Sequence, residues 1–248
     1  MVNEKRSAAR PGLLWVLVRK FFMDVLKNPG LLAICLFPVL FLLVCRLVIV
    51  SPLEHDDARL FLLVFGMLFS TSMVPGTTII YPLAEAREKR TLRTLTLAGV
   101  GRAQLIAAHG IVGALYTALV AAGCFIVSGE ALDSMLPFML ITVLASGPLI
   151  ALSLALGLAS RNQMAAYFFS LPVILVSFAP MFCMYSEAAF QALPLLLSGG
   201  GFALVYALAE GTLLAPASIL PAVAQLAWIV ASLIALVMVA PGIPRDDQ

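Results

Sequence analysis

Residues 54–57, Glu-His-Asp-Asp, form the one compact cluster whose side chains could hold a metal ion or exchange protons. An imidazole beside carboxylates suits acid–base chemistry. No second cluster with ligand spacing accompanies it, so a solvated turn is the favoured interpretation. The alternative is an intramembrane enzyme that uses His55. We therefore predict no catalytic residue and no metal site in this chain.

The sequence also lacks the motifs of nucleotide hydrolysis and of cation-coupled transport. The chain contains no G-x-x-x-x-G-K-[ST] pattern, the glycine-rich loop that cradles nucleotide phosphates. No carboxylate stands at the centre of a long apolar run, where a proton- or sodium-coupled carrier usually needs one. Both observations argue against an ATPase or a cation-coupled carrier.

Charge gathers instead in one short run, EAREKRTLRTLTLAGVGR at residues 85–102, between very apolar segments. Leu92 and Leu95 recur at helical spacing, and Glu85 and Glu88 stand at the start, where acidic groups suit the helix dipole. We expect a short helix on the membrane surface that can dock a partner. The alternative is a basic anchor that only fixes topology.

The composition places these residues in a membrane protein. The chain is 62% hydrophobic and 11% charged, whereas soluble domains are roughly 45–50% apolar and about 25% charged. A span needs roughly 20 mostly apolar residues. We expect one all-α transmembrane domain over residues 1–248, with six spans at residues 31–50, 60–83, 105–127, 136–159, 164–185 and 218–240.

The basic residues set the orientation of these spans. With a cytoplasmic N-terminus, all of the 15 lysines and arginines except Arg46 and Arg59 lie on the cytoplasmic side. We expect a multi-pass protein of a cell membrane, such as a bacterial inner membrane, with both termini in the cytoplasm. Membrane lipid is a predicted partner, and nucleic acid is not.

Two segments outside the spans are also apolar. Residues 12–28 place Val18, Phe21 and Val25, with Leu14, Trp15, Phe22 and Leu26, on one helical face and four charged residues on the other. This pattern predicts an interfacial amphipathic helix, and part of one long kinked span is the alternative. Residues 188–217 are interrupted by Ser-Gly-Gly-Gly. We expect an outer re-entrant or surface hairpin there, with a seventh span as the alternative.

The charged run resembles the cytoplasmic loop of type-2 ABC transporter permeases. Residues 87–106, REKRTLRTLTLAGVGRAQLI, carry the resemblance. Three positions depart from the family pattern: Arg90 stands where Gly is usual, Gly99 where Pro is usual, and His109 where a Lys often begins the next span. The six spans, the amphipathic helix and the outer hairpin also look like that family. The matching residues are Glu88, Lys89, Thr91, Leu92, Leu95 and Arg102.

The resemblance implies a permease subunit that pairs with a second copy or a homologue. Each subunit would engage a separate cytoplasmic ATPase, which binds ATP and Mg²⁺, through a coupling helix within residues 84–102. The implied cargo is hydrophobic or amphipathic, such as a drug, antibiotic or peptide, exported by alternating access. The alternatives are export of a lipid-linked glycan, haem or a cation, and a non-transporting sensor or immunity protein. The implied coupling residues are Glu85, Arg87, Glu88, Lys89, Arg90, Thr91, Leu92, Leu95 and Arg102.

Polar side chains in two spans are candidates for a translocation path. In the second span, Ser70 and Thr77 lie seven residues apart, as do Thr71 and Thr78, and Pro75–Gly76 between them could bend the helix. The alternative is that these hydroxyls bond backbone carbonyls or neighbouring helices. Members of the family use the second and fifth spans as cavity walls. The candidates in the fifth span are Ser170, Ser177, Phe178 and Met181.

Overall fold

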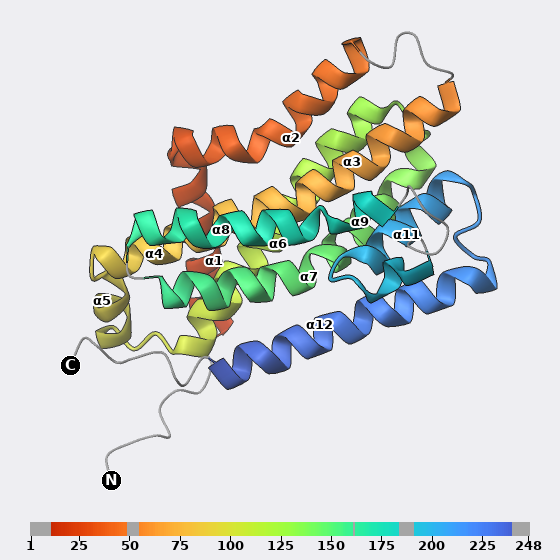
Figure 1. Cartoon of the computed structure of the whole chain (residues 1–248). Helices are drawn as coiled ribbons and strands as arrows, with labels where there is room; N and C mark the ends of the chain where they lie inside the picture. Colours follow the sequence, from red (N-terminus) through yellow and green to blue (C-terminus); the bar gives the residue numbers. More distant parts are fainter. Residues whose placement is uncertain (1–10, 49–54, 161, 184–190, 240–248) are drawn as a thin grey trace.

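The computed structural model describes residues 11–48, 55–160, 162–183 and 191–239, and every regular element in these ranges is a helix (Figure 1). The α-helices are α1 (Pro11–Lys27), α2 (Pro29–Val48), α3 (His55–Pro75), α4 (Tyr81–Glu88), α5 (Thr91–Leu97), α6 (Arg102–Ser128), α7 (Met135–Ala159), α8 (Gln163–Ser177), α9 (Ala179–Phe182), α11 (Gly199–Ala209) and α12 (Ile219–Val239). A π-helical segment, η2 (Gly76–Ile80), joins α3 to α4, and the 3₁₀ turns are η3 (Leu132–Ser134), η5 (Leu193–Leu195) and η6 (Pro216–Ser218).

Six helices are long and apolar enough to cross a membrane, so the chain is an all-helical, multi-pass membrane protein. The second of them differs from the expected span. It was expected at residues 60–83, but the helix continues to Glu88, so the first residues of the expected loop are helical. The six are Pro29–Val48, Ala58–Glu88, Arg102–Ser128, Leu132–Ala159, Gln163–Phe182 and Pro216–Met238.

Successive spans run in opposite directions and form one bundle (Figure 1). The second span is its centre, since 72% of its apolar window is buried within the chain, against 11% for the last span. Small residues allow this close packing. A Cβ atom on Gly113 of α6 would lie 2.7 Å from a methyl carbon of Ile79, and one on Gly66 of α3 would lie 2.9 Å from the Cβ atom of Cys124.

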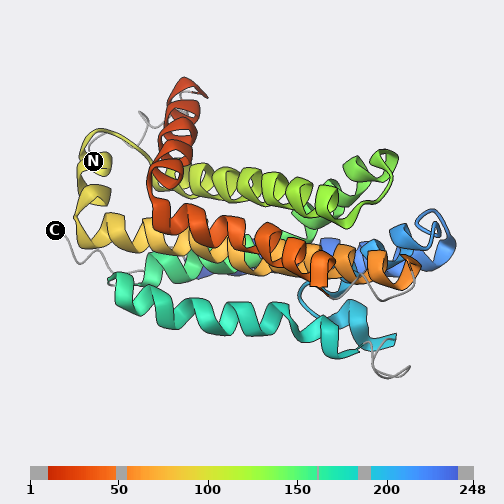
Figure 2. The same ribbon diagram turned by 90° about the horizontal axis from the view of Figure 1, so that it is seen from above.

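One end of the bundle carries α1, α5 and the turn between α7 and α8, and we call it the basic end (Figure 1). There α1 runs across the bundle axis rather than along it (Figure 2). Its buried face packs on α6, where the Tyr116 hydroxyl donates to the carbonyl oxygen of Phe22 at 2.9 Å. Trp15 was expected to share a helical face with Val18, but Val18 is buried whereas Trp15 is 67% exposed, and Leu17 is buried beside Val18.

The bend expected at Pro75 and Gly76 takes the form of the π-helical segment η2. Proline has no amide hydrogen to donate to the preceding turn, so the regular helical ladder cannot pass through it. The hydroxyls of Thr77 and Thr78 donate to carbonyl oxygens four residues earlier, at 2.7 and 2.8 Å. The ladder therefore changes register while these carbonyls keep partners, and the helix continues without a break.

The segment before the last span contains a short helix, α11, at the end of the bundle opposite to α5 (Figure 1). Its 11 residues extend about 16 Å, roughly half of the hydrocarbon core of a bilayer. Among the described residues there is thus no seventh span. Gln225 of α12 fixes this helix: its side-chain oxygen accepts from the amide of Gly201 at 3.0 Å, and its amide nitrogen donates to the carbonyl oxygen of Leu144 at 3.4 Å.

We predict that Gln225→Leu destabilises the fold by about 1–3 kcal/mol, because the buried amide of Gly201 loses its acceptor. Thermal unfolding of the purified chain in detergent micelles would measure the effect. Gln191→Leu is the matched control, since Gln191 is exposed in the same segment. Equal unfolding midpoints for the two variants would contradict the assigned role of Gln225.

Candidate functional site

Arg87, in the last turn of α4, contacts the end of α7. Its guanidinium donates to the carbonyl oxygen of Leu158 at 2.7 Å and reaches that of Ser160 at 3.5 Å. The last carbonyls of an α-helix have no partner within the helix and carry its negative dipole end. A half-buried cation at this position therefore gives these carbonyl oxygens a hydrogen-bond donor and stabilises the C-terminus of α7.

Glu88, the next residue, contacts the start of α8. Its carboxylate accepts from the backbone amide of Gln163 at 3.1 Å, and the side chain of Asn162 caps the same helix by accepting from the amide of Ala165 at 2.8 Å. Free amides and the positive dipole end make a helix N-terminus favourable for an anion. Arg87 and Glu88 thus hold the two sides of the α7–α8 turn, and we call this pair the turn clamp.

The short helix α5 follows directly after the clamp, in the expected loop. Leu92 and Leu95 are half-buried and pack against the core cluster that includes Leu17 and Leu105, so they face inward. The outward apolar residue is Leu97, which is 81% exposed and was not among the expected coupling residues. The sequence could have indicated this, because a residue two positions after Leu95 lies on the opposite side of a helix.

The remaining coupling candidates lie around the clamp. Lys89 pairs with Glu85 one turn earlier, and this hydrogen bond raises the pKa of the lysine ammonium. Thr91 is half-buried at the start of α5, and Arg102 is exposed at the start of α6. The structure therefore brings all the coupling candidates to one end of the bundle, but it turns the two leucines inward and pairs several of the charges within the chain.

Arg90 sits in an unusual backbone conformation. Its φ angle is +56°, in the left-handed region that residues with a Cβ atom seldom adopt. Arg90 stands where the permease loop pattern has Gly, and at this position Gly would adopt the backbone conformation without strain. Gly99, at the other end of the loop, has φ +86°, a conformation that proline cannot adopt.

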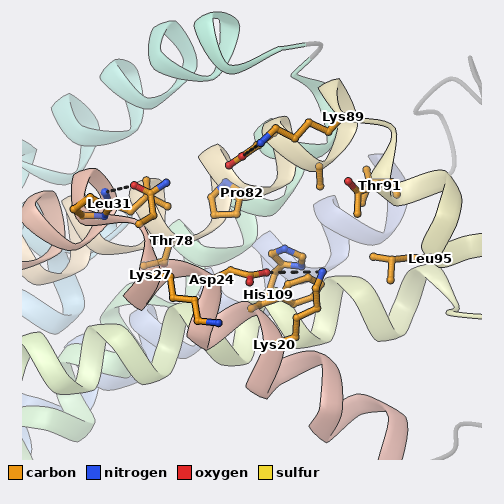
Figure 3. Close-up of a pocket in the computed structure, with 16 residues that line it drawn as sticks. Lys20, Asp24, Lys27, Leu31, Thr78, Pro82, Lys89, Thr91, Leu95 and His109 are labelled. Atoms are coloured by element: carbon orange, nitrogen blue, oxygen red, sulfur yellow. Dashed lines mark hydrogen bonds and ion pairs between the residues drawn. The ribbon is translucent and has the colours of Figure 1, made fainter.

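A cavity of about 660 Å³ lies beside the clamp (Figure 3). It is open on one side and lined by α1, the start of α2, the region from η2 to α5, and α6. Lys20 and Asp24 of α1 line one side, and Lys89 and Thr91 line the other. His109 of α6 also lines the cavity and is buried, with its ring 3.9 Å from that of Phe21 between centroids.

The hydroxyl groups proposed for a translocation path lie inside the subunit. Those of Thr71, Thr77 and Thr78 donate to carbonyl oxygens of their own helix, and Ser70 also contacts the sulfur of Cys124 at 3.6 Å. Ser177 in α8 likewise donates to carbonyls of its own helix. This is the arrangement that the backbone-bonding alternative requires, and a role in translocation stays a prediction.

Contacts between the second and fifth spans involve the remaining candidates. Ser170 of α8 hydrogen-bonds the hydroxyl of Tyr81 at 3.0 Å. Phe178 packs edge-on against Phe69, with 5.0 Å between ring centroids. Met181 packs against the second core cluster, which includes Met67 and Phe202. Two further sets of ring contacts start at Phe69: one runs along α3 to Phe65 and Phe61, and the other crosses to Phe41 and Phe37 of α2.

The acidic cluster at residues 54–57 lies outside the residues whose side chains the structure describes. Within the described part of the chain, no group of three or more His, Cys, Asp or Glu side chains could hold a metal ion.

No model of a known protein family matches the sequence of this chain, and no curated protein gives a significant match. Its function must therefore be inferred from its own residues.

We predict that Arg87→Met lowers the free energy of unfolding by about 1–3 kcal/mol, because the C-terminus of α7 loses a charge-assisted donor. Arg102→Met is the control, because Arg102 is exposed at the start of a helix. Denaturation in mixed micelles would measure both variants. A loss in the control as large as that in Arg87→Met would contradict the bridging role.

We predict that Arg90→Gly raises the free energy of unfolding by about 0.5–1 kcal/mol. Relief of left-handed strain, worth about 1–2 kcal/mol, exceeds the greater entropy of glycine in the unfolded chain. Arg90→Ala removes the same charge but keeps the Cβ atom, so it should give no such gain. Equal stabilisation by both substitutions would show that charge, rather than backbone strain, is responsible.

Proposed function

We propose that this chain is the membrane-spanning permease subunit of an ATP-binding cassette transporter that exports a hydrophobic or amphipathic cargo such as a drug, antibiotic or peptide. A separate cytoplasmic ATPase supplies ATP and Mg²⁺ binding, and a second copy of the chain or a homologue completes the complex. The loop motif at residues 87–106 and the six apolar helices support this assignment.

One observation carries the proposal: a short helix with an exposed apolar residue is joined, through the turn clamp, to two spans distant in sequence. Leu97 offers a contact on the outer side of α5. Arg87 and Glu88 tie the residues just before α5 to α7 and α8. A force applied to α5 would therefore reach the fourth and fifth spans as well as the second.

The membrane placement follows from the charge pattern. The basic end faces the cytoplasm, α1 lies in the headgroup region there, and the segment around α11 is re-entrant from the outer side. The transverse course of α1 relative to the bundle supports an interfacial position (Figure 2).

The cargo path lies where two subunits meet rather than through one of them. The hydroxyls of the second span are satisfied within the subunit, whereas Phe37 is exposed and Phe69 and Phe178 are half-buried. Aromatic faces suit a hydrophobic cargo because they offer large contact areas without demanding hydrogen bonds. Movement of α8, transmitted by the clamp, would open or close this aromatic surface.

We predict that Leu97→Asp abolishes co-purification of an ATPase subunit with the tagged chain, while membrane insertion stays normal. A charged side chain in the docking surface would leave an unpaired charge at the interface. Leu214→Asp is the matched control, because Leu214 is 98% exposed beside η6 at the opposite end of the bundle. Mass spectrometry of the purified complexes identifies what is bound. The proposal fails if no ATPase accompanies the wild type in several mild detergents, or if Leu97→Asp retains it fully.

A further inference from the structure

The cavity at the basic end has the size and position of a ligand site. Its volume of about 660 Å³ falls within the range of about 300–1,000 Å³ typical of small-molecule pockets. Its lining includes α1, which crosses the end of the bundle (Figure 2), and the first turn of α2, where the first span begins. In the membrane placement proposed above, on which this inference rests, the cavity lies at the level of the lipid headgroups.

The charges lining the cavity sum to one net positive charge. Three lysines, Lys20, Lys27 and Lys89, line it together with two carboxylates, Asp24 and Glu85. Lys20 pairs with Asp24 at 3.8 Å, and Lys89 pairs with Glu85. Lys27 makes no ion pair within the described part of the chain. The cavity therefore complements a single negative charge, which is the charge of a phosphodiester.

His109 adds a hydrogen-bond acceptor to the cavity. Its Nδ1 atom lies 3.0 Å from the carbonyl oxygen of Leu105. Because a carbonyl only accepts, Nδ1 must carry the hydrogen, and in the neutral ring Nε2 is then an acceptor. Among the described residues, no hydrogen bond joins Nε2 to another group, and the residue lines the cavity, so this nitrogen is an acceptor open to an occupant. A hydroxyl or ammonium group of the occupant can donate to it.

Apolar residues complete the cavity and continue outside it. Phe21, Leu31 and Leu92 are among its lining residues. The next turns of α2 expose Leu36 and Leu40, at 45% and 57%, as apolar surface. A molecule with a charged head and a hydrocarbon tail could bury its head in the cavity and lay its tail along this helix.

We propose that the cavity binds the headgroup of a phospholipid that carries one phosphodiester and a terminal hydrogen-bond donor, as in phosphatidylglycerol or phosphatidylethanolamine. The phosphate lies near Lys27, and the hydroxyl or ammonium donates to His109 Nε2. A phosphatidylcholine headgroup has the same phosphate, but its trimethylammonium end has no hydrogen to donate.

Native mass spectrometry of the delipidated full chain, titrated with each of these lipids, tests the proposal. Wild type should bind phosphatidylglycerol and phosphatidylethanolamine more tightly than phosphatidylcholine. Lys27→Ala should weaken phosphatidylglycerol binding about tenfold, because one charge-assisted hydrogen bond is lost. Arg19→Ala is the matched control, since Arg19 is exposed on α1 and does not line the cavity. Lys27→Gln repeats the test if the alanine variant fails to fold.

His109→Leu separates the two parts of the headgroup. It should remove the preference for phosphatidylethanolamine over phosphatidylcholine, which have the same net charge and differ in the terminal donor, while leaving phosphatidylcholine binding unchanged. Inorganic phosphate and soluble glycerophosphoglycerol serve as competitors that have the headgroup chemistry without a tail. Equal binding of all three lipids, equal losses in Lys27→Ala and Arg19→Ala, or full displacement by millimolar inorganic phosphate would each overturn the lipid site.

Discussion

The ends of two helices, α7 and α8, present backbone groups that no residue within those helices can satisfy. Arg87 and Glu88, adjacent in sequence and opposite in charge, satisfy them from the end of the second span. Each charge meets the dipole end that it stabilises, so the order of the two residues matters. This clamp fixes where α4 ends, and the position of α5 and the wall of the neighbouring cavity depend on it.

Away from the clamp, toward its middle, the second span has irregular backbone hydrogen bonding. Pro75 and the π-helical residues of η2 interrupt its regular hydrogen bonding near the middle of the bundle. Segments of this kind are frequent at functional sites and hinges. The end of the second span is thus fixed by the contacts of the clamp, whereas its centre is irregular. That combination suits a helix that transmits displacement from one end of a membrane protein to its interior.

Hydropathy was enough to predict the six apolar helices, and the spacing of Leu92 and Leu95 was enough to predict a short helix between the second and third of them. Glu85 and Glu88 were expected at the start of that short helix, but they lie in α4, and α5 begins at Thr91. Hydropathy and spacing could not predict the partners of Arg87 and Glu88, which are backbone atoms more than 70 residues away and leave no mark in the sequence. The seven-residue spacing of Ser70 and Thr77 correctly indicated polar helix positions. It could not show that their hydroxyls are satisfied within the subunit, since periodicity gives a face but not its neighbours.

We propose that the α5 loop and the α7–α8 turn move as one unit, joined by the contacts of Arg87 and Glu88. Hydrogen exchange of the chain in lipid nanodiscs, comparing wild type with Glu88→Gln, tests it most directly. Loss of the carboxylate should accelerate exchange at the first turn of α8, residues 163–166, because Glu88 contacts it, and in α5 as well, because Glu88 ends the helix that leads into α5. Faster exchange confined to residues 85–90, with the start of α8 as protected as in wild type, would contradict the claim.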